Sequence, residues 1–110
     1  MFCKIVRKEV AAKIVLDEQD ILAFYDSNPQ APVHVLVIPK QHVVDLDSMG
    51  AERGALGGTL LRACSRVAGM LALGGTGYRV VANNGAGAGQ SVFHLHFHVL
   101  GGRQLGWPPG

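Results

Sequence analysis

The residues best suited to chemistry form one short run near the C-terminus, His94-Leu95-His96-Phe97-His98. Side chains alternate between the two faces of a strand, so an extended run predicts that the three imidazoles share one face. Leu95, Phe97 and Val99 would then share the opposite face. Imidazole can act as nucleophile, acid or base near neutral pH, and three of the chain's five histidines lie in this row. The pattern therefore favours an active site over a row of exposed histidines with no role.

A metal site is the alternative chemistry for such a row. Zinc binds histidine nitrogens at about 2.0–2.1 Å in a tetrahedron, whereas strand residues four apart are about 13 Å apart at Cα. His94 and His98 therefore cannot converge on one ion, and a zinc site would need His34, His42 or a cysteine. Because Cys3 and Cys64 form no metal-binding spacing, we expect two reduced cysteines and no metal or other cofactor.

A glycine-rich segment, residues 83–91, leads directly into the histidine row. Glycine permits positive φ and close backbone approach, and successive N–H groups in such a loop can form an anion-binding concavity. Asn83 adds an amide at its entrance and Ser91 a hydroxyl at its exit. Glycine-rich connections between strands are also common without a ligand. Beside three imidazoles, the segment favours phosphate chemistry.

The remaining elements indicate an α+β domain with an antiparallel sheet. Short β-rich runs at residues 13–17 and 21–25 predict a hairpin, and the apolar run at 33–38 predicts a central strand. Apolar residues recur at helical spacing from Leu56 to Leu71, with Asp47 or Ser48 as the start and Gly74-Gly75 as the end. Residues 78–83 and 91–100 predict two further strands, and residues 2–10 one helical turn. The Gly57-Gly58 pair within the long helix has no explanation in the sequence.

The segment from Gln90 to Arg103 resembles the signature of the histidine triad (HIT) superfamily, His-x-His-x-His followed by apolar residues. Further segments are similar to the Hint branch, the histidine triad nucleotide-binding proteins: residues 2–8, 26–34, 37–40 and 107–110. The resemblance implies a sheet of five antiparallel strands with one long helix and a short N-terminal helix. It also implies a homodimer in which two sheets join.

The resemblance assigns the chemistry to four histidines. His96 would attack the α-phosphorus of a purine nucleotide and form a nucleotidyl-histidine, which water releases as a nucleoside monophosphate such as AMP. His98 would hydrogen-bond the phosphoryl oxygens or assist the leaving group, while His94 and His34 would orient the nucleophile. From the residues alone, the alternative for His34 is a hydrogen-bonded histidine within the sheet.

The resemblance also implies a nucleotide-binding set. Asp26 would accept both ribose hydroxyls, although an Asp before Asn-Pro also caps turns. Ser27 stands where related proteins often carry an aliphatic residue against the base. The purine would pack on Phe2, Ile5 and Phe24, and the phosphates would be held by Asn83, Gly89, Gln90 and Ser91. We expect Trp107, in the apolar tail of residues 101–110, to dock at the dimer interface or beside the leaving group.

Length and composition limit the class of protein to which this chain can belong. A chain of 110 residues with a net charge of +2 predicts one domain, residues 1–110, with neither a polybasic run for nucleic acid nor an apolar stretch for a membrane. No signal peptide is recognised, so we expect a cytoplasmic protein. The expected activity is hydrolysis of purine nucleoside phosphoramidates without a metal. The alternatives are a nucleotide-binding interaction protein with incidental turnover, a dinucleoside polyphosphate hydrolase, and a zinc-binding module.

Overall fold

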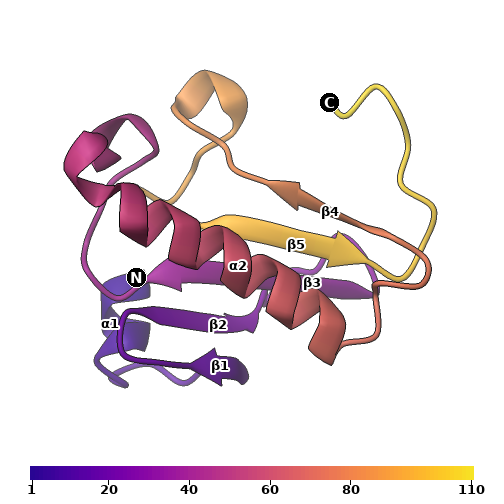
Figure 1. Cartoon of the computed structure of the whole chain (residues 1–110), viewed down its shortest axis with the longest axis horizontal. Helices are drawn as coiled ribbons and strands as arrows, with labels where there is room; N and C mark the ends of the chain where they lie inside the picture. The colour runs from indigo at the N-terminus through magenta and orange to yellow at the C-terminus, as the bar shows by residue number, and fades with distance from the viewer.

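A computed structural model describes residues 1–110 and contains one antiparallel sheet of five strands in the order β1-β2-β3-β5-β4. The long helix α2 crosses one face of the sheet, and the short helix α1 lies near the β1–β2 hairpin (Figure 1). The strands are β1 (Ile14–Asp17), β2 (Ile21–Tyr25), β3 (Val33–Pro39), β4 (Tyr78–Val81) and β5 (Phe97–Gly101), and the α-helices are α1 (Phe2–Val6) and α2 (Gly54–Met70). This architecture confirms the predicted fold class.

The alternation of side chains divides the core between the two faces of the sheet. On the α2 face, Val35, Val37 and Val99 pack against helix residues that include Leu60 and Val67. On the opposite face a smaller cluster joins α1 to the sheet: Phe2, Ile5, Leu22, Phe24, Leu36 and Ile38. The second face also carries the imidazoles, because Leu36 pairs with His98 across β3 and β5.

The long helix differs from its prediction at both ends. Two turns of 3-10 helix, Asp47–Met49 and Ala51–Arg53, precede it, and Asp45 accepts hydrogen bonds from the backbone and hydroxyl of Ser48 at 2.9 and 2.7 Å. The helix ends at Met70, before the Gly74-Gly75 pair, because Ala72 takes a left-handed conformation with φ of +59°. A Cβ on Gly57 would lie 3.0 Å from Cε of Met49, so this glycine makes room for the preceding turn.

The last strand is shorter than the predicted strand at 91–100. Because β5 begins only at Phe97, His94 and His96 lie in the segment that leads into it, and the strict alternation applies from His96 onward. Leu95, Phe97 and Val99 do share the α2 face, as expected. The strand predicted at 78–83 likewise ends at Val81. No helix in the structure combines the length and apolar character needed to cross a bilayer.

Candidate active site

A cleft of about 1110 Å³ opens on the sheet face opposite α2. Its walls come from α1, the end of β2, the turn that follows it, and the segment leading into β5. Of the expected site residues it is lined by Phe2, Ile5, Phe24, Asp26, Ser27, His34, Ser91, His96 and His98. Elements far apart in the sequence therefore bring nine of the predicted residues to one cavity.

His96 lies at the inner wall of this cleft with its side chain held in one tautomer. Its Nδ1 is 2.7 Å from the backbone carbonyl of His94, and because a carbonyl only accepts, Nδ1 carries the proton. The Nε2 lone pair is then free, and no group of the chain hydrogen-bonds it. The residue is 9% exposed, and the Phe2 ring stands edge-on against it at a centroid distance of 5.2 Å. This arrangement suits an imidazole nucleophile.

His34 and His98 form a chain of hydrogen bonds whose direction follows from the backbone. The N–H of Gln30 donates to Nδ1 of His34 at 3.0 Å, so the His34 proton is on Nε2. That Nε2–H donates to Nδ1 of His98 at 2.8 Å, which places the His98 proton on its own Nε2. The Nε2–H of His98 is buried without a partner, although the residue lines the cleft. A buried donor left unpaired marks the position where a ligand acceptor would lie.

Burial keeps these imidazoles neutral. Desolvation lowers the pKa of His98 to about 4, with smaller contributions from the neighbouring His96 and His34. Desolvation also lowers the pKa of His34, against the opposing effect of Asp26, and lowers that of His94. At neutral pH the network therefore presents hydrogen-bond donors and lone pairs to the cleft, and its cationic forms are disfavoured.

Asp26 performs the turn-capping role that the sequence left open. Its Oδ1 accepts from the backbone N–H of Asn28 at 2.8 Å, and its Oδ2 lies 3.4 Å from Nε2 of His34. A carboxylate has about four acceptor positions, so these two contacts leave capacity for a diol. Asp26 lines the cleft, which makes capping the turn compatible with binding a ribose.

The glycine-rich loop differs in detail from a row of free N–H groups. The N–H groups of Ala88, Gly89 and Gln90 donate to carbonyls of Gly85 and Ala86 within the loop. Gly89 contributes a left-handed conformation, with φ of +93°. The hydroxyl and the N–H of Ser91 make no hydrogen bond within the chain, and Ser91 lines the cleft. The donors available to a phosphate therefore lie at the exit of the loop.

Five predicted residues do not line the cleft: His94, Asn83, Gly89, Gln90 and Trp107. Asn83 is partly buried at the start of the loop, and the Gln90 side chain is 4% exposed and bonded within the protein. Trp107 is 81% exposed, with its ring 5.8 Å from the guanidinium of Arg79, which also donates to the carbonyl of Gly106 at 2.8 Å. Within one chain, the tail is therefore anchored to β4 and does not reach the cleft.

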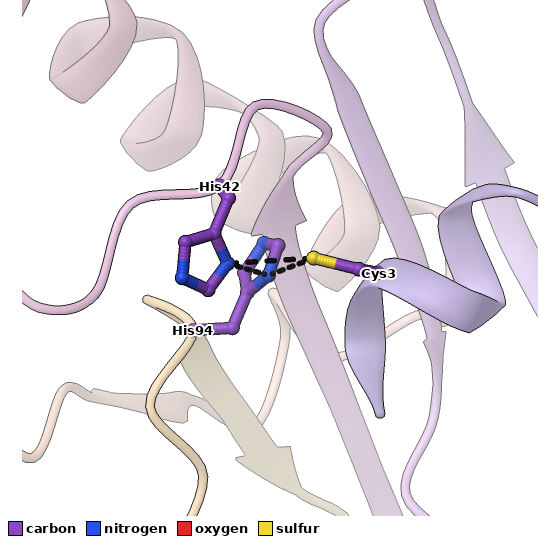
Figure 2. A group of neighbouring side chains, drawn as sticks. All are labelled: Cys3, His42 and His94. Carbon is purple, nitrogen blue, oxygen red and sulfur yellow. Dashed lines mark hydrogen bonds between the residues drawn. The ribbon is translucent and has the colours of Figure 1, made fainter.

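His94 belongs to a second cluster that the sequence analysis did not find. Figure 2 shows Cys3 from α1, His42 from the loop after β3 and His94 converging on one point. The Nδ1 atoms of His42 and His94 are 3.3 Å apart, and Sγ of Cys3 lies 3.3 and 3.5 Å from them. Nε2 of His94 donates to the carbonyl of Pro39 at 2.8 Å, which leaves the Nδ1 lone pair aimed into the cluster. His42, one of the residues named above as able to complete a zinc site, is exposed and joins this cluster; positions 3, 42 and 94 have no common spacing in the sequence that would reveal it.

The outer histidines of the triad thus lie in separate clusters, as the strand spacing required. His98 groups with Asp26 and His34, whereas His94 groups with Cys3 and His42, and each set holds ligand atoms within 4.8 Å of one another. In the first set, which consists of predicted nucleotide-site residues, His34 hydrogen-bonds His98 and lies 3.4 Å from Asp26. The second consists of one thiol and two imidazoles, which are the donors that zinc prefers.

Comparison with known proteins agrees with this fold. The HIT domain profile matches residues 7–105 of the chain. An uncharacterized HIT-like protein of Synechocystis is 52% identical over 110 residues, which cover all of this chain and 96% of that protein. A HIT family hydrolase from Legionella pneumophila superposes with a TM-score of 0.98 at 43% identity, covering 100% of this chain and 98% of that one. A histidine triad protein from Clostridium difficile gives a TM-score of 0.92 at 36% identity, covering 96% and 91%.

A fold of this topology with an imidazole-lined cleft defines a histidine triad protein. The chain belongs to the HIT domain family.

Proposed function

We propose that this protein is a hydrolase of the Hint branch that cleaves purine nucleoside phosphoramidates and releases a nucleoside monophosphate. One observation carries the proposal: the free Nε2 lone pair of His96 and the unpartnered Nε2–H of His98 line the same cleft, with ring centroids 5.0 Å apart. A nucleophile beside a hydrogen-bond donor is the pair that displacement at phosphorus needs. The Legionella relative, a named HIT family hydrolase, supports hydrolysis as the reaction class.

In the proposed first step, Nε2 of His96 attacks the α-phosphorus and a P–N bond to His96 forms as the P–N bond to the substrate amine breaks. The leaving nitrogen takes one proton from the imidazole network through His98. In the second step, water attacks the phosphorus, the bond to His96 breaks, and the water's proton returns to the network. The net reaction consumes one water and yields a nucleoside monophosphate and an amine. His96 supplies the nucleophile, so neither step requires a metal.

The rest of the cleft supplies binding and orientation. Phe2, Ile5 and Phe24 provide an apolar wall for a purine, and Asp26 has free acceptor positions for the ribose hydroxyls. Ser91 offers its hydroxyl and N–H to the phosphate, and Ser27 would lie beside the base. His34 acts on the reaction through His98, which its hydrogen bond orients.

Turnover of a fluorogenic adenosine phosphoramidate tests the proposal. The assay compares the wild type, with and without chelator, with His96→Ala, and compares the rate with that on diadenosine polyphosphates. We expect turnover that survives chelation, disappears in the variant and exceeds the rate on dinucleotides. Faster cleavage of the dinucleotides would favour the dinucleoside polyphosphate hydrolase. A folded wild type that binds AMP without turnover would favour a nucleotide-binding interaction protein.

The assembly is part of the same proposal. We infer one domain, residues 1–110, that forms a homodimer through a shared sheet and acts in the cytoplasm. The edge strand β4 exposes Tyr78 and Val80, and the exposed Trp107 lies beside it on Arg79. A second copy would cover these apolar side chains. A mass measurement in solution that finds only monomer would remove both the dimer and the docked tail.

The Cys3–His42–His94 cluster favours zinc binding as a second function. With Zn–N of about 2.0–2.1 Å and Zn–S of about 2.3 Å, ligand atoms at neighbouring corners of a tetrahedron lie about 3.3–3.6 Å apart. The three separations in the cluster, 3.3, 3.3 and 3.5 Å, fall in this range. The hydrogen bond from His94 to Pro39 also fixes the tautomer that a ligand requires.

Elemental analysis of purified protein tests this second function directly. We expect stoichiometric zinc in the wild type and its loss in Cys3→Ser, whereas Cys64→Ser, at a buried cysteine on α2, serves as the matched control. If the wild-type protein holds no zinc after exposure to the metal, zinc binding by this cluster is refuted. Turnover that disappears only with chelator would make the zinc part of the catalytic site.

A further inference from the structure

The Gln90 side chain makes three hydrogen bonds from a buried position, and the proposed mechanism does not use it. Its Oε1 accepts from the N–H of Gly85 at 2.8 Å, and its Nε2 donates to the carbonyls of Val44 and Val92 at 2.9 and 3.2 Å. The residue is 4% exposed, so the amide is fully committed within the protein. A glutamine amide that uses both its carbonyl and its NH₂ group in this way holds three backbone segments in a fixed relation.

These three segments meet at the entrance and exit of the glycine-rich loop. Gly85 opens the loop with φ of +89°, Val92 follows Ser91 at its exit, and Val44 belongs to the separate segment after β3. The backbone N–H of Gln90 also donates to the carbonyl of Gly85 at 3.1 Å, so the loop is closed by main chain and side chain together. Ser91, whose donors are free, lies between two points that the amide fixes.

The same scaffold fixes the histidines. The N–H of Leu95 donates to the carbonyl of Val43 at 2.6 Å, next to the carbonyl of Val44 that accepts from Gln90. Residues 43 and 44 therefore bind the triad segment and the loop side by side. Through this pair, the position of Ser91 is tied to that of His96.

We infer that Gln90 is a positioning residue that holds the donors of Ser91 at the phosphate subsite beside His96. This inference rests on the proposed function and deepens it, because it separates the phosphate subsite from the base and ribose subsites. The Gln90 side chain does not line the cleft, and its amide is bonded within the protein. Its loss should weaken binding of the phosphate while leaving the nucleoside contacts intact.

Binding of AMP and of adenosine, measured by calorimetry on the full chain, separates the two subsites. The probe variants are Gln90→Met, which keeps the shape but loses every hydrogen bond, and Gln90→Glu, which keeps the acceptor for Gly85 but turns a carboxylate toward two carbonyls. We expect the ratio of AMP to adenosine affinity to fall about tenfold or more in both, because displaced Ser91 donors would lose their hydrogen bonds to the charged phosphate. Adenosine affinity should stay within about twofold of the wild type. A change of that size in the binding free energy is well below the 1.4 kcal/mol that corresponds to a tenfold change.

Val67→Ala is the control for loss of stability alone, because Val67 lies on α2 with its side chain buried against the sheet, on the face opposite the cleft. Its affinity ratio should match the wild type even where its melting temperature falls as far as that of Gln90→Met. A folded Gln90 variant that retains the wild-type ratio overturns the inference. A wild type that binds AMP no better than adenosine instead overturns the proposed function, so the two failures are distinguishable.

Discussion

The partly buried imidazole of His98 should make the protein lose stability in mild acid. Its pKa is about 4 in the folded chain against 6.5 ordinarily, so between these values the unfolded state binds a proton that the native state excludes. Stability therefore rises with pH across this range, falls as pH drops from about 6.5 to about 4, and changes no further below that through this group.

The magnitude follows from the size of the displacement. A pKa lowered from 6.5 to about 4 corresponds to a loss of about 3 kcal/mol in the free energy of unfolding once the pH has fallen through both values. Because the His98 ring is only partly buried, solvent screening reduces the expected contribution to about 1–2 kcal/mol. Since burial also lowers the pKa of His34 and His94, the wild type should lose more than this single contribution.

Urea denaturation of the wild type and of His98→Gln, each at about pH 7.5 and about pH 4.5, isolates the His98 contribution. From the higher to the lower pH, the free energy of unfolding should fall by about 1–2 kcal/mol more in the wild type than in His98→Gln, because glutamine does not titrate. Each protein serves as its own reference, so a difference in stability at the higher pH does not matter. An equal pH dependence in both proteins would refute the assignment of a neutral, buried imidazole at position 98.

Three further substitutions test the packing and a surface ion pair of the fold by thermal or urea denaturation. Phe2→Ala removes a buried ring from the edge of the apolar wall and should cost about 3 kcal/mol, near the low end for such truncations because α1 is one short helix that can relax. Gly102→Ala should cost about 1–3 kcal/mol, because φ is +90° and the new Cβ would lie 2.9 Å from Cβ of Pro32. Arg66→Ala should leave the melting temperature almost unchanged despite two hydrogen bonds to Glu18, because that pair is exposed; a drop as large as that of Phe2→Ala would contradict this reasoning.

Local patterns predicted the elements of this fold well. The hairpin, the central strand and the long helix each carry a period or a turn that depends on near neighbours in the sequence. The boundaries were less predictable, because tertiary contacts decide them. The segment before Phe97 has strand-like residues but leaves the sheet, since the N–H of Leu95 bonds to the carbonyl of Val43.

The site was predictable where residue type alone limits the chemistry. Three imidazoles in a row and a glycine-rich lead indicated catalysis on a phosphate, and the cleft brings His96 together with His98, Asp26 and Ser91. Two features of the site could not be predicted from the sequence. The thiol–imidazole cluster joins three residues with no common spacing, and the role of Gln90 depends on a long-range hydrogen bond to Val44.

The stereochemical course at phosphorus tests the central claim most directly. A substrate made chiral at the α-phosphorus with sulfur and an oxygen isotope reports whether one displacement or two occur. Attack by His96 followed by attack by water inverts the centre twice, so the account predicts a thio-monophosphate product with net retention of configuration. Net inversion would mean that water attacks the substrate directly, and would contradict the covalent role of His96.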